Sequence, residues 1–343
     1  MSFLKSSSRA LRSLLIKLVR PLLALLVAVL VACGLLYLAF ALLLHTARES
    51  LRSRPDPAPD YEMALSRFQE IQKTEGTELD PICRSTLLTH GMRTERAVVF
   101  FHGYTNCPEQ FRELGQIFYN TGDNVLIPRL PRHGMADRQV ENLSPLKAEE
   151  LRDCADTSVD IACGLGRKVY VAGLSAGGTL TAWIAQNRNE VTRTVLIAPA
   201  LGFTRREGTR LQKAMALLLP LLPDVRTDWF SIDPKAPNHT YPGFSSRALG
   251  QLLRLGVATF AGAIDQAPRV QDVVLVTSKS DESVSYQVTW QLIGLWRSKG
   301  LLKFTAVDFP KAMQIEHDMI DPAHPNEQIH SVYPILVSLL NAP

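Results

Sequence analysis

The stretch Lys168-Val169-Tyr170-Val171-Ala172-Gly173-Leu174-Ser175-Ala176-Gly177 decides the fold. An apolar, β-branched run leads directly into a Gly-x-Ser-x-Gly motif, and a helix-like segment follows from Ala176 to Ala185. In this context the motif forms a tight strand-to-helix turn, in which glycines avoid collisions and the serine hydroxyl stands above the sheet. We therefore predict that Ser175 is a nucleophile. The alternative is a Gly/Ser turn with a purely structural role.

Further strand-like runs lie on both sides of this stretch and alternate with helix-like segments. They are Ala97–Phe101, Asn124–Ile127, Thr194–Ile197, Val273–Val276 and Lys303–Val307. Continuous apolar runs of this length are typical of parallel strands that are buried on both faces. We predict an α/β fold with a mostly parallel central sheet and helices on both faces, one of them opening at Ser144-Pro145.

The long interval between Ile197 and Val273 contains no convincing core strand. It holds two helix-like pieces, Leu211–Leu222 and Ser246–Ala261, separated by loops rich in proline and aromatic residues. We expect a helical cap insertion over about residues 200–268. Such an insertion would lie over the carboxyl ends of the strands, where open α/β sheets bind their ligands.

A serine nucleophile needs a general base, and the base needs a carboxylate that orients it. When the three residues follow in the order serine, acid, histidine, the loops after the last two strands supply the partners. Asp281 is the predicted acid, with Glu282 as its competitor. His317 is the predicted base, and His324 and His330 are the later alternatives.

The strand that ends in Phe101-His102-Gly103-Tyr104 is expected to supply part of an oxyanion hole. The backbone N–H of Tyr104 would be one donor, and the backbone N–H of Ala176 the other. We interpret His102 as a histidine that holds this turn. His133, in His133-Gly134, is likewise interpreted as structural rather than as a metal ligand, because no partner stands at ligand spacing.

Together these motifs resemble those of the α/β-hydrolase superfamily, and within it the bacterial carboxylesterases and monoacylglycerol-lipase-like serine hydrolases. Their pattern of strand, His-Gly-aromatic, Arg-x-x-x-His-Gly and Gly-Leu-Ser-x-Gly-Gly is matched by Phe101–Tyr104, Arg129–Gly134 and Gly173–Gly178. The resemblance covers about residues 80–343. It implies a catalytic triad and an oxyanion hole made of Ser175, Asp281, His317, Tyr104 and Ala176.

The expected reaction is the hydrolysis of carboxylic esters, for example of monoacylglycerols or lysophospholipids. The same triad also serves amidases, peptidases and thioesterases, and a binding module without catalysis is a further alternative. No His-Glu-x-x-His, Cys-x-x-Cys or Gly-x-x-x-x-Gly-Lys-[Ser/Thr] motif occurs, so we expect neither a metal nor another cofactor. Residues 1–54 carry a net charge of +7 and the whole chain +4, so the rest of the chain is slightly acidic at −3, which argues against nucleic-acid binding.

The N-terminal region is predicted to anchor the protein in a membrane. After a basic segment, residues 1–21, the stretch Leu22–Leu44 has no charge, and as a helix it would be about 34 Å long, enough to cross a bilayer. A cleaved signal peptide and a lipoprotein modified at Cys33 are the alternatives. Residues 45–60 read as a proline-rich spacer before a hydrolase domain at 61–343. The excess of basic residues before the span predicts a domain on the periplasmic side of a bacterial inner membrane.

The remaining cysteines permit one disulfide. If the domain is extracytoplasmic, a bond between Cys83 and Cys107 would stiffen the predicted oxyanion loop, and two free thiols are the alternative. Cys154 and Cys163 are expected on one helix, too far apart to be bonded.

Overall fold

The computed structural model describes residues 23, 25–32, 34–35, 38, 49–202, 209–228, 237–325 and 327–342. The chain divides into two units, Met1–Ser50 and Leu51–Pro343. The described residues between 23 and 38 are helical and exposed, and part of the predicted span at 22–44 lies outside the described residues. Within the described ranges, no helix is both long enough and apolar enough to cross a membrane.

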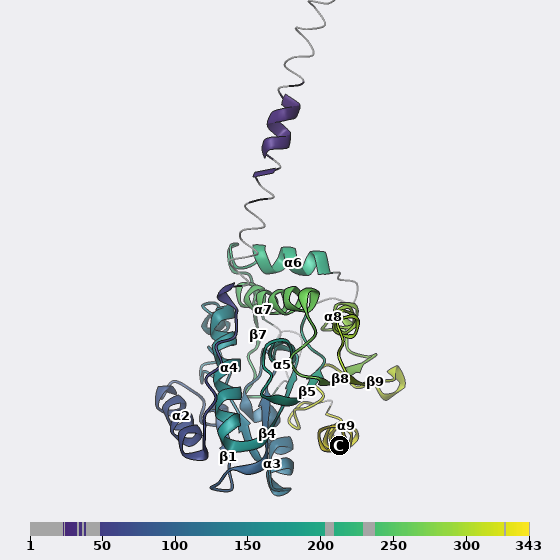
Figure 1. The fold of residues 1–343 in the computed structure, drawn as a ribbon. Coiled ribbons are helices and arrows are strands. Elements are labelled where there is room, and N and C mark those ends of the chain that lie inside the picture. Colours follow the sequence, from purple (N-terminus) through teal and green to yellow (C-terminus); the bar gives the residue numbers. More distant parts are fainter. Residues whose placement is uncertain are drawn as a thin grey trace, which may run out of the picture. The chain divides into compact units, whose positions relative to one another are not determined.

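A seven-stranded sheet forms the centre of the second unit (Figure 1). Its order is β1-β3-β2-β4-β5-β8-β9, and only the edge strand β1 runs antiparallel to its neighbour. The predicted parallel sheet is therefore present. Its strands are β1 (Thr86–Leu88), β2 (Thr94–Phe101), β3 (Asn124–Ile127), β4 (Gly166–Leu174), β5 (Val191–Ile197), β8 (Asp272–Ser278) and β9 (Lys303–Phe309).

Helices flank this sheet and bury its central strands, whereas the edge strand β9 is buried only at Phe309 (Figure 1). They are α2 (Tyr61–Thr74), α3 (Arg112–Asn120), α4 (Ala148–Leu165), α5 (Ala176–Asn187), α8 (Tyr286–Ser298) and α9 (Ile329–Asn341). The α4 helix begins three residues later than Ser144-Pro145 predicts. The reason is local: the Glu150 carboxylate accepts a hydrogen bond from the Lys147 N–H (2.9 Å), which caps the helix at that point.

The cap lies between β5 and β8, as the sequence predicts. Its elements are α6 (Thr209–Leu218), β6 (Arg226–Asp228), β7 (Gly243–Ser245) and α7 (Ser246–Asp265). The two short strands pair only with each other and do not extend the central sheet. The α7 helix packs on both α5 and α6, so it connects the cap to the helix that follows Ser175.

Residues 51–58, here called the strap, pack against the domain. Leu51 is 2% exposed, and its carbonyl oxygen accepts a hydrogen bond from the Trp183 indole N–H (3.2 Å). The Ser53 hydroxyl donates to the Asp156 carboxylate (2.6 Å). The strap contains no helix or strand, and its contacts make it part of the domain rather than the spacer that the sequence predicts. The domain therefore begins at Leu51 rather than at residue 61.

A buried arginine organises the surface on which the strap lies. The Arg188 guanidinium is fully buried and donates to the carboxylates of Asp156 (2.8 Å), Asp160 (2.5 Å) and Glu190 (3.0 Å). Asp160 in turn accepts a hydrogen bond from the Asp56 N–H of the strap (3.1 Å). Breaking a buried ion pair of this kind leaves a charge without compensation, so the strap and the arginine depend on each other.

Candidate active site

Ser175 occupies the turn between β4 and α5 in a strained backbone conformation. Its φ of 58° and ψ of −111° are unusual for a residue with a side chain. The turn is held because the Ser175 N–H donates to the Ile197 carbonyl (2.9 Å) and the Gly177 N–H to the His102 carbonyl (3.1 Å). The ends of three adjacent strands thus fix the position of the serine.

The glycines of the motif permit this close approach. A Cβ atom on Gly177 would lie 1.9 Å from the Phe101 carbonyl oxygen, and one on Gly173 would lie 2.3 Å from the Gly177 carbonyl oxygen. Both distances are impossible for real atoms. The sequence pattern is therefore required by the packing of the turn against the end of β2.

His317 and Asp281 come from the loops after β9 and β8, and the structure joins them. The His317 Nδ1 lies 2.7 Å from Asp281 Oδ2, and Asp281 Oδ1 accepts a hydrogen bond from the Ser283 N–H (2.8 Å). With Nδ1 engaged, Nε2 is the nitrogen that is left to exchange a proton with a substrate or nucleophile.

The charges of this pair stabilise each other. Burial by itself lowers the pKa of His317, but the charge of Asp281 and its hydrogen bond outweigh burial, and the pKa is raised above 6.5. For Asp281, burial works to raise the pKa, and the histidine outweighs it, so the pKa of the carboxyl is lowered. The carboxylate is thus kept ionised beside the imidazole.

The structure also places the alternative acid, Glu282, and the alternative bases, His324 and His330. Glu282 is exposed and lines the same pocket, whereas it is Asp281 that bonds to the His317 ring. His324 also lines the pocket. His330 lies in α9, as the sequence suggests.

The predicted oxyanion donors stand at the ends of β2 and β4. Tyr104 follows Gly103, whose N–H is bonded to the Gln110 side chain (2.7 Å), and Ala176 is the first residue of α5. Within the described residues, neither the Tyr104 nor the Ala176 amide donates to another protein group. Both are therefore available to bind developing negative charge on a substrate oxygen.

The two histidines of the turns are buried and structural. His102 bonds through Nδ1 to the Gly103 carbonyl (2.8 Å) and accepts from the Leu130 N–H (3.0 Å). The His133 ring lies between two carbonyl oxygens, 2.5 Å from that of Tyr104. Burial lowers the pKa of His133 to about 4, and that of His102 well below its ordinary value. The hydrogen bonds of both rings hold the oxyanion loop.

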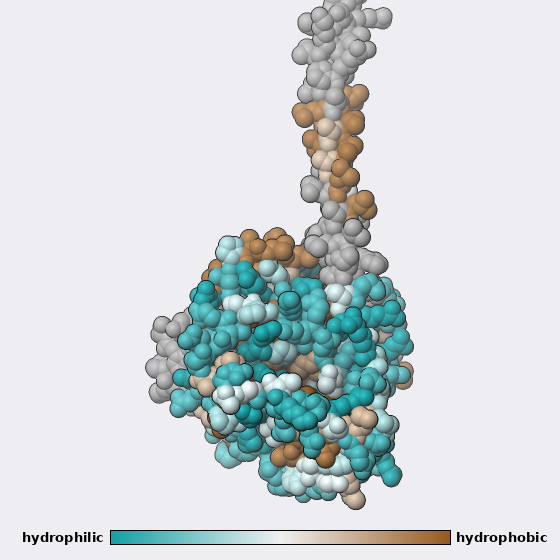
Figure 2. Space-filling model, turned by 90° about the vertical axis from the view of Figure 1, so that its left-hand side faces the viewer, coloured by the Kyte–Doolittle hydropathy of each residue, from teal (hydrophilic) through white to brown (hydrophobic). Residues whose placement is uncertain are grey.

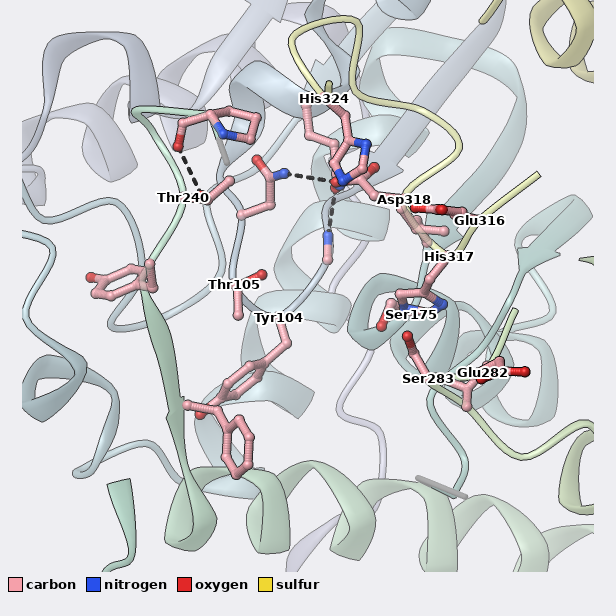
Figure 3. A pocket seen from close by; sticks show the side chains of 18 of the residues that line it. Tyr104, Thr105, Ser175, Thr240, Glu282, Ser283, Glu316, His317, Asp318 and His324 are labelled. Carbon is pink, nitrogen blue, oxygen red and sulfur yellow. Dashed lines mark hydrogen bonds between the residues drawn. The ribbon is translucent and has the colours of Figure 1, made fainter. Parts of the chain in front are cut away.

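A cavity of about 870 Å³ opens over Ser175 (Figure 3). Ser175 and His317 both line it, as do Asp318 and His324. The lining includes both apolar and polar side chains. The apolar ones are Tyr104, Leu174, Pro237, Tyr241, Pro242, Phe244, Leu249 and Val284; the polar or charged ones include Thr105, Asn106, Gln110, Thr240, Glu282, Glu316, Asp318 and His324.

A polar network beside the pocket was not predicted from the sequence. The Gln110 amide donates to both carboxylate oxygens of Asp318 (2.9 Å each), and the Asn106 amide donates to Asp321 (3.0 Å). Asp321 is also bonded to His239 of the cap (2.7 Å). Asp318 directly follows His317 in the sequence, and this adjacency could have indicated that it lies near the site. No spacing rule connects Asp321 to His239.

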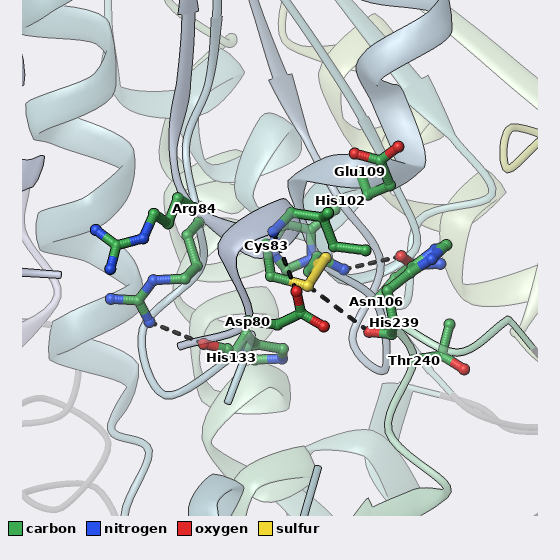
Figure 4. The surroundings of a disulfide bond; sticks show 12 residues. Asp80, Cys83, Arg84, His102, Asn106, Glu109, His133, His239 and Thr240 are labelled. Atoms are coloured by element: carbon green, nitrogen blue, oxygen red, sulfur yellow. Dashed lines mark hydrogen bonds between the residues drawn. A yellow bond between two sulfur atoms is a disulfide. The ribbon is translucent and has the colours of Figure 1, made fainter. Parts of the chain in front are cut away.

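Cys83 and Cys107 form a disulfide in this structure, with their Cα atoms 5.2 Å apart (Figure 4). The bond closes the chain around β2 and the loop that carries Tyr104. Cys154 and Cys163 both lie in α4 and are free thiols. In the part of the chain that the structure describes, no group of three or more His, Cys, Asp or Glu side chains could hold a metal ion.

Comparison with known proteins identifies the family of the chain. A model of the alpha/beta hydrolase family matches residues 98–316. A thermostable monoacylglycerol lipase from Bacillus sp. (strain H-257) is 28% identical over 110 residues, which are 30% of this chain and 40% of that enzyme. The match therefore spans less than half of the length of that relative.

Solved structures of lipolytic enzymes share the fold. The monoacylglycerol lipase of Paleococcus ferrophilus superposes with a TM-score of 0.55 at 16% identity, covering 75% of this chain and 97% of its own. A metagenome-derived lipolytic enzyme gives a TM-score of 0.52 at 18% identity, covering 77% of this chain and all of its own. At these identities the likeness shows the fold alone.

Proposed function

The chain belongs to the alpha/beta hydrolase family, and from that premise we propose that it is a serine hydrolase that cleaves carboxylic esters. One observation carries the proposal. Ser175, which is held in a strained turn, lines the same cavity as His317, and Nδ1 of His317 is bonded to the buried Asp281. Strained residues, cavities and histidine–carboxylate pairs are each ambiguous alone, but their coincidence is characteristic of acyl transfer.

In the proposed mechanism, the Ser175 hydroxyl attacks the ester carbonyl while His317 Nε2 accepts its proton. Asp281 holds the imidazole in the required tautomer and stabilises the imidazolium that forms. The Tyr104 and Ala176 amides bind the oxyanion of the tetrahedral intermediate. His317 then protonates the leaving alcohol, and a water molecule activated by the same residue releases the acid from the serine.

The lining of the cavity supports an amphiphilic ester as substrate. Apolar side chains such as Phe244 and Leu249 suit an acyl chain, while Thr105, Asn106 and Thr240 can bond to the hydroxyl groups of an alcohol. Monoacylglycerols and lysophospholipids combine both properties. The Bacillus relative, a monoacylglycerol lipase by name, agrees with this choice.

The proposal includes a membrane anchor and an extracytoplasmic domain. It rests on the uncharged stretch Leu22–Leu44 and on the basic residues that precede it. A second feature agrees with a lipid environment: an apolar patch where α6 ends in the cap (Figure 2), made of Leu218, Leu221, Leu222 and Val225, which are 49–77% exposed. Exposed apolar side chains that gather on one part of a surface are typical of sites of interaction.

The test is a fluorophosphonate probe combined with a substrate series. We expect the wild-type chain to be labelled and to hydrolyse p-nitrophenyl esters and monoacylglycerols. The Ser175→Ala variant should fold normally, remain unlabelled and lose turnover by several orders of magnitude. Matched amide and thioester substrates in the same series would reveal an amidase or thioesterase. Labelling that persists in Ser175→Ala would refute the assignment of the nucleophile.

A further inference from the structure

One wall of the cavity is a short segment of the cap. Residues 237–242, here called the pocket wall, contribute Pro237, Thr240, Tyr241 and Pro242 to the lining. The backbone of this wall is attached to the oxyanion loop, because the Tyr241 N–H donates to the Thr105 carbonyl (2.7 Å). One side of the wall is therefore fixed relative to Tyr104.

The other side of the wall is attached to the loop that carries His317. The His239 ring bonds through Nε2 to Asp321 Oδ2 (2.7 Å), and Asp321 lies only four positions after His317. Both partners are buried, with side chains 6% and 1% exposed. Asn106 of the oxyanion loop donates to the same carboxylate oxygen (3.0 Å), so three parts of the site meet at Asp321.

The charges around His239 favour an ion pair at this point. Burial opposes the charged ring, but Asp321 outweighs it, with smaller contributions from Glu109 and Asp318, so the pKa of His239 is raised. The pKa of Asp321 is lowered, since its hydrogen bonds to His239 and Asn106 outweigh the effect of its burial. The disulfide flanks the pair, with the Cys83 sulfur 3.9 Å from the His239 carbonyl oxygen (Figure 4).

Buried ion pairs contribute little net stability compared with apolar residues of the same size, and their best-supported role is to select one arrangement. We propose that His239 and Asp321 are positioning residues: their bond holds the pocket wall against the loop that carries His317, and thereby sets the shape of the substrate cavity. This inference rests on the proposed esterase function and adds to it a determinant of substrate binding that lies outside the triad.

The experiment measures kcat and KM for a monoacylglycerol and for p-nitrophenyl acetate, which occupies little of the cavity. In His239→Leu the ring is replaced by a side chain that cannot donate. We expect KM for the monoacylglycerol to rise about tenfold, corresponding to roughly 1.4 kcal/mol of binding. The value of kcat should change by less than about threefold, because the triad is untouched, and acetate hydrolysis should be nearly unaffected.

Two further variants separate positioning from general damage. His239→Gln keeps a donor toward Asp321 and should recover most of the lost affinity. Asp321→Asn can still accept a hydrogen bond from a neutral His239, so its KM for the monoacylglycerol should be intermediate. This variant replaces His239→Leu as the test if His239→Leu does not fold. The matched control is His90→Leu, a histidine stacked on Tyr119 away from the cavity, which should leave KM unchanged.

The outcomes are distinct. An unchanged KM for the monoacylglycerol in folded His239→Leu would overturn the inference and leave the proposed function standing. Equal losses of activity in His239→Leu and His239→Gln, on both substrates, would also overturn it, because such losses indicate general disruption of the domain. A wild-type chain that is neither labelled by fluorophosphonate nor active would refute the proposed function itself, and this inference with it.

Discussion

At the scale of single residues, the turn at Ser175 has almost no tolerance for additional atoms. A methyl group at Gly177 would overlap the Phe101 carbonyl oxygen, which belongs to the backbone of a central strand and cannot move aside. We expect Gly177→Ala to destabilise the domain by about 3 kcal/mol, the upper end of the usual cost of overpacking a core site, and to abolish ester hydrolysis. Urea unfolding and an esterase assay measure the two effects.

Gly294 in α8 is the matched control for this substitution. A Cβ atom there would meet nothing within 4 Å. Gly294→Ala should therefore stabilise the domain by about 0.5–1 kcal/mol through helix propensity, with unchanged activity. If both alanine variants behaved alike, the steric explanation of the Gly-x-Ser-x-Gly turn would be wrong.

The raised pKa of His317 predicts the pH dependence of the reaction. The imidazole must be neutral to accept the serine proton, so kcat/KM should fall as the pH drops through the pKa of His317 in the free enzyme. Since Asp281 raises that pKa above 6.5, the acid limb should have its midpoint above 6.5. Asp281→Asn should move the limb to lower pH and reduce the rate severely. A limb well below pH 6 in the wild type would contradict this assignment.

The sequence predicted Ser175, Asp281 and His317 because each follows a recognisable strand in a fixed order. It did not predict the pair of His239 and Asp321. Those residues are 82 positions apart, and nothing local distinguishes either of them from a solvated loop residue. Their contact results from how the cap returns over the sheet, which depends on tertiary packing rather than on periodicity.

At the scale of elements, strong apolar runs were predictable and short pieces were not. The predicted strands β2, β4, β5 and β8 have long buried stretches, whereas β9 is a partly exposed edge strand and β1 has only three residues at the other edge. The hairpin of β6 and β7 is equally short. Residues 51–58 form no helix or strand, but composition carries no information about how this segment packs on the domain, which depends on the distant Trp183 and Arg188.

The docking of the strap has a measurable consequence for truncation. A chain that begins at Glu49 keeps every strap contact and should unfold at the same urea concentration as the full domain. A chain that begins at Asp60 loses the burial of Leu51. It also loses the hydrogen bonds that Ser53 and Asp56 donate to Asp156 and Asp160. We expect that chain to be less stable by about 3 kcal/mol or more. Equal stability of the two chains would show that the strap contributes nothing to the fold.

At the scale of the whole molecule, sidedness and the disulfide can be tested together. If the domain is periplasmic, a C-terminal alkaline phosphatase fusion should be active and a fluorescent protein that matures only in the cytoplasm should remain dark. Cys83 and Cys107 should then resist alkylation in the unfolded chain until a reductant is added. An inactive phosphatase fusion with freely alkylated thiols would place the domain in the cytoplasm.

The apolar patch predicts reversible lipid binding by the domain itself. The chain that begins at Glu49 should sediment with phosphatidylglycerol-containing vesicles. Replacing Leu221 and Leu222 by lysine should abolish this sedimentation, because charged side chains are costly at the apolar level of a bilayer. Leu302→Lys, at a residue 82% exposed outside the patch, is the control and should bind as the wild type does. Binding that survives the double substitution would exclude the patch.

The strap also constrains the order of events during synthesis. Ser53 leaves the ribosome 103 residues before its partner Asp156, and Leu51 precedes Trp183 by 132 residues. At about 5–20 residues per second, the N-terminal segment waits on the order of ten seconds before a docking surface exists. The strap therefore cannot complete its docking before the chain has grown past Arg188, although the strap itself was made first. A nascent chain stalled before that point should leave the strap open to protease.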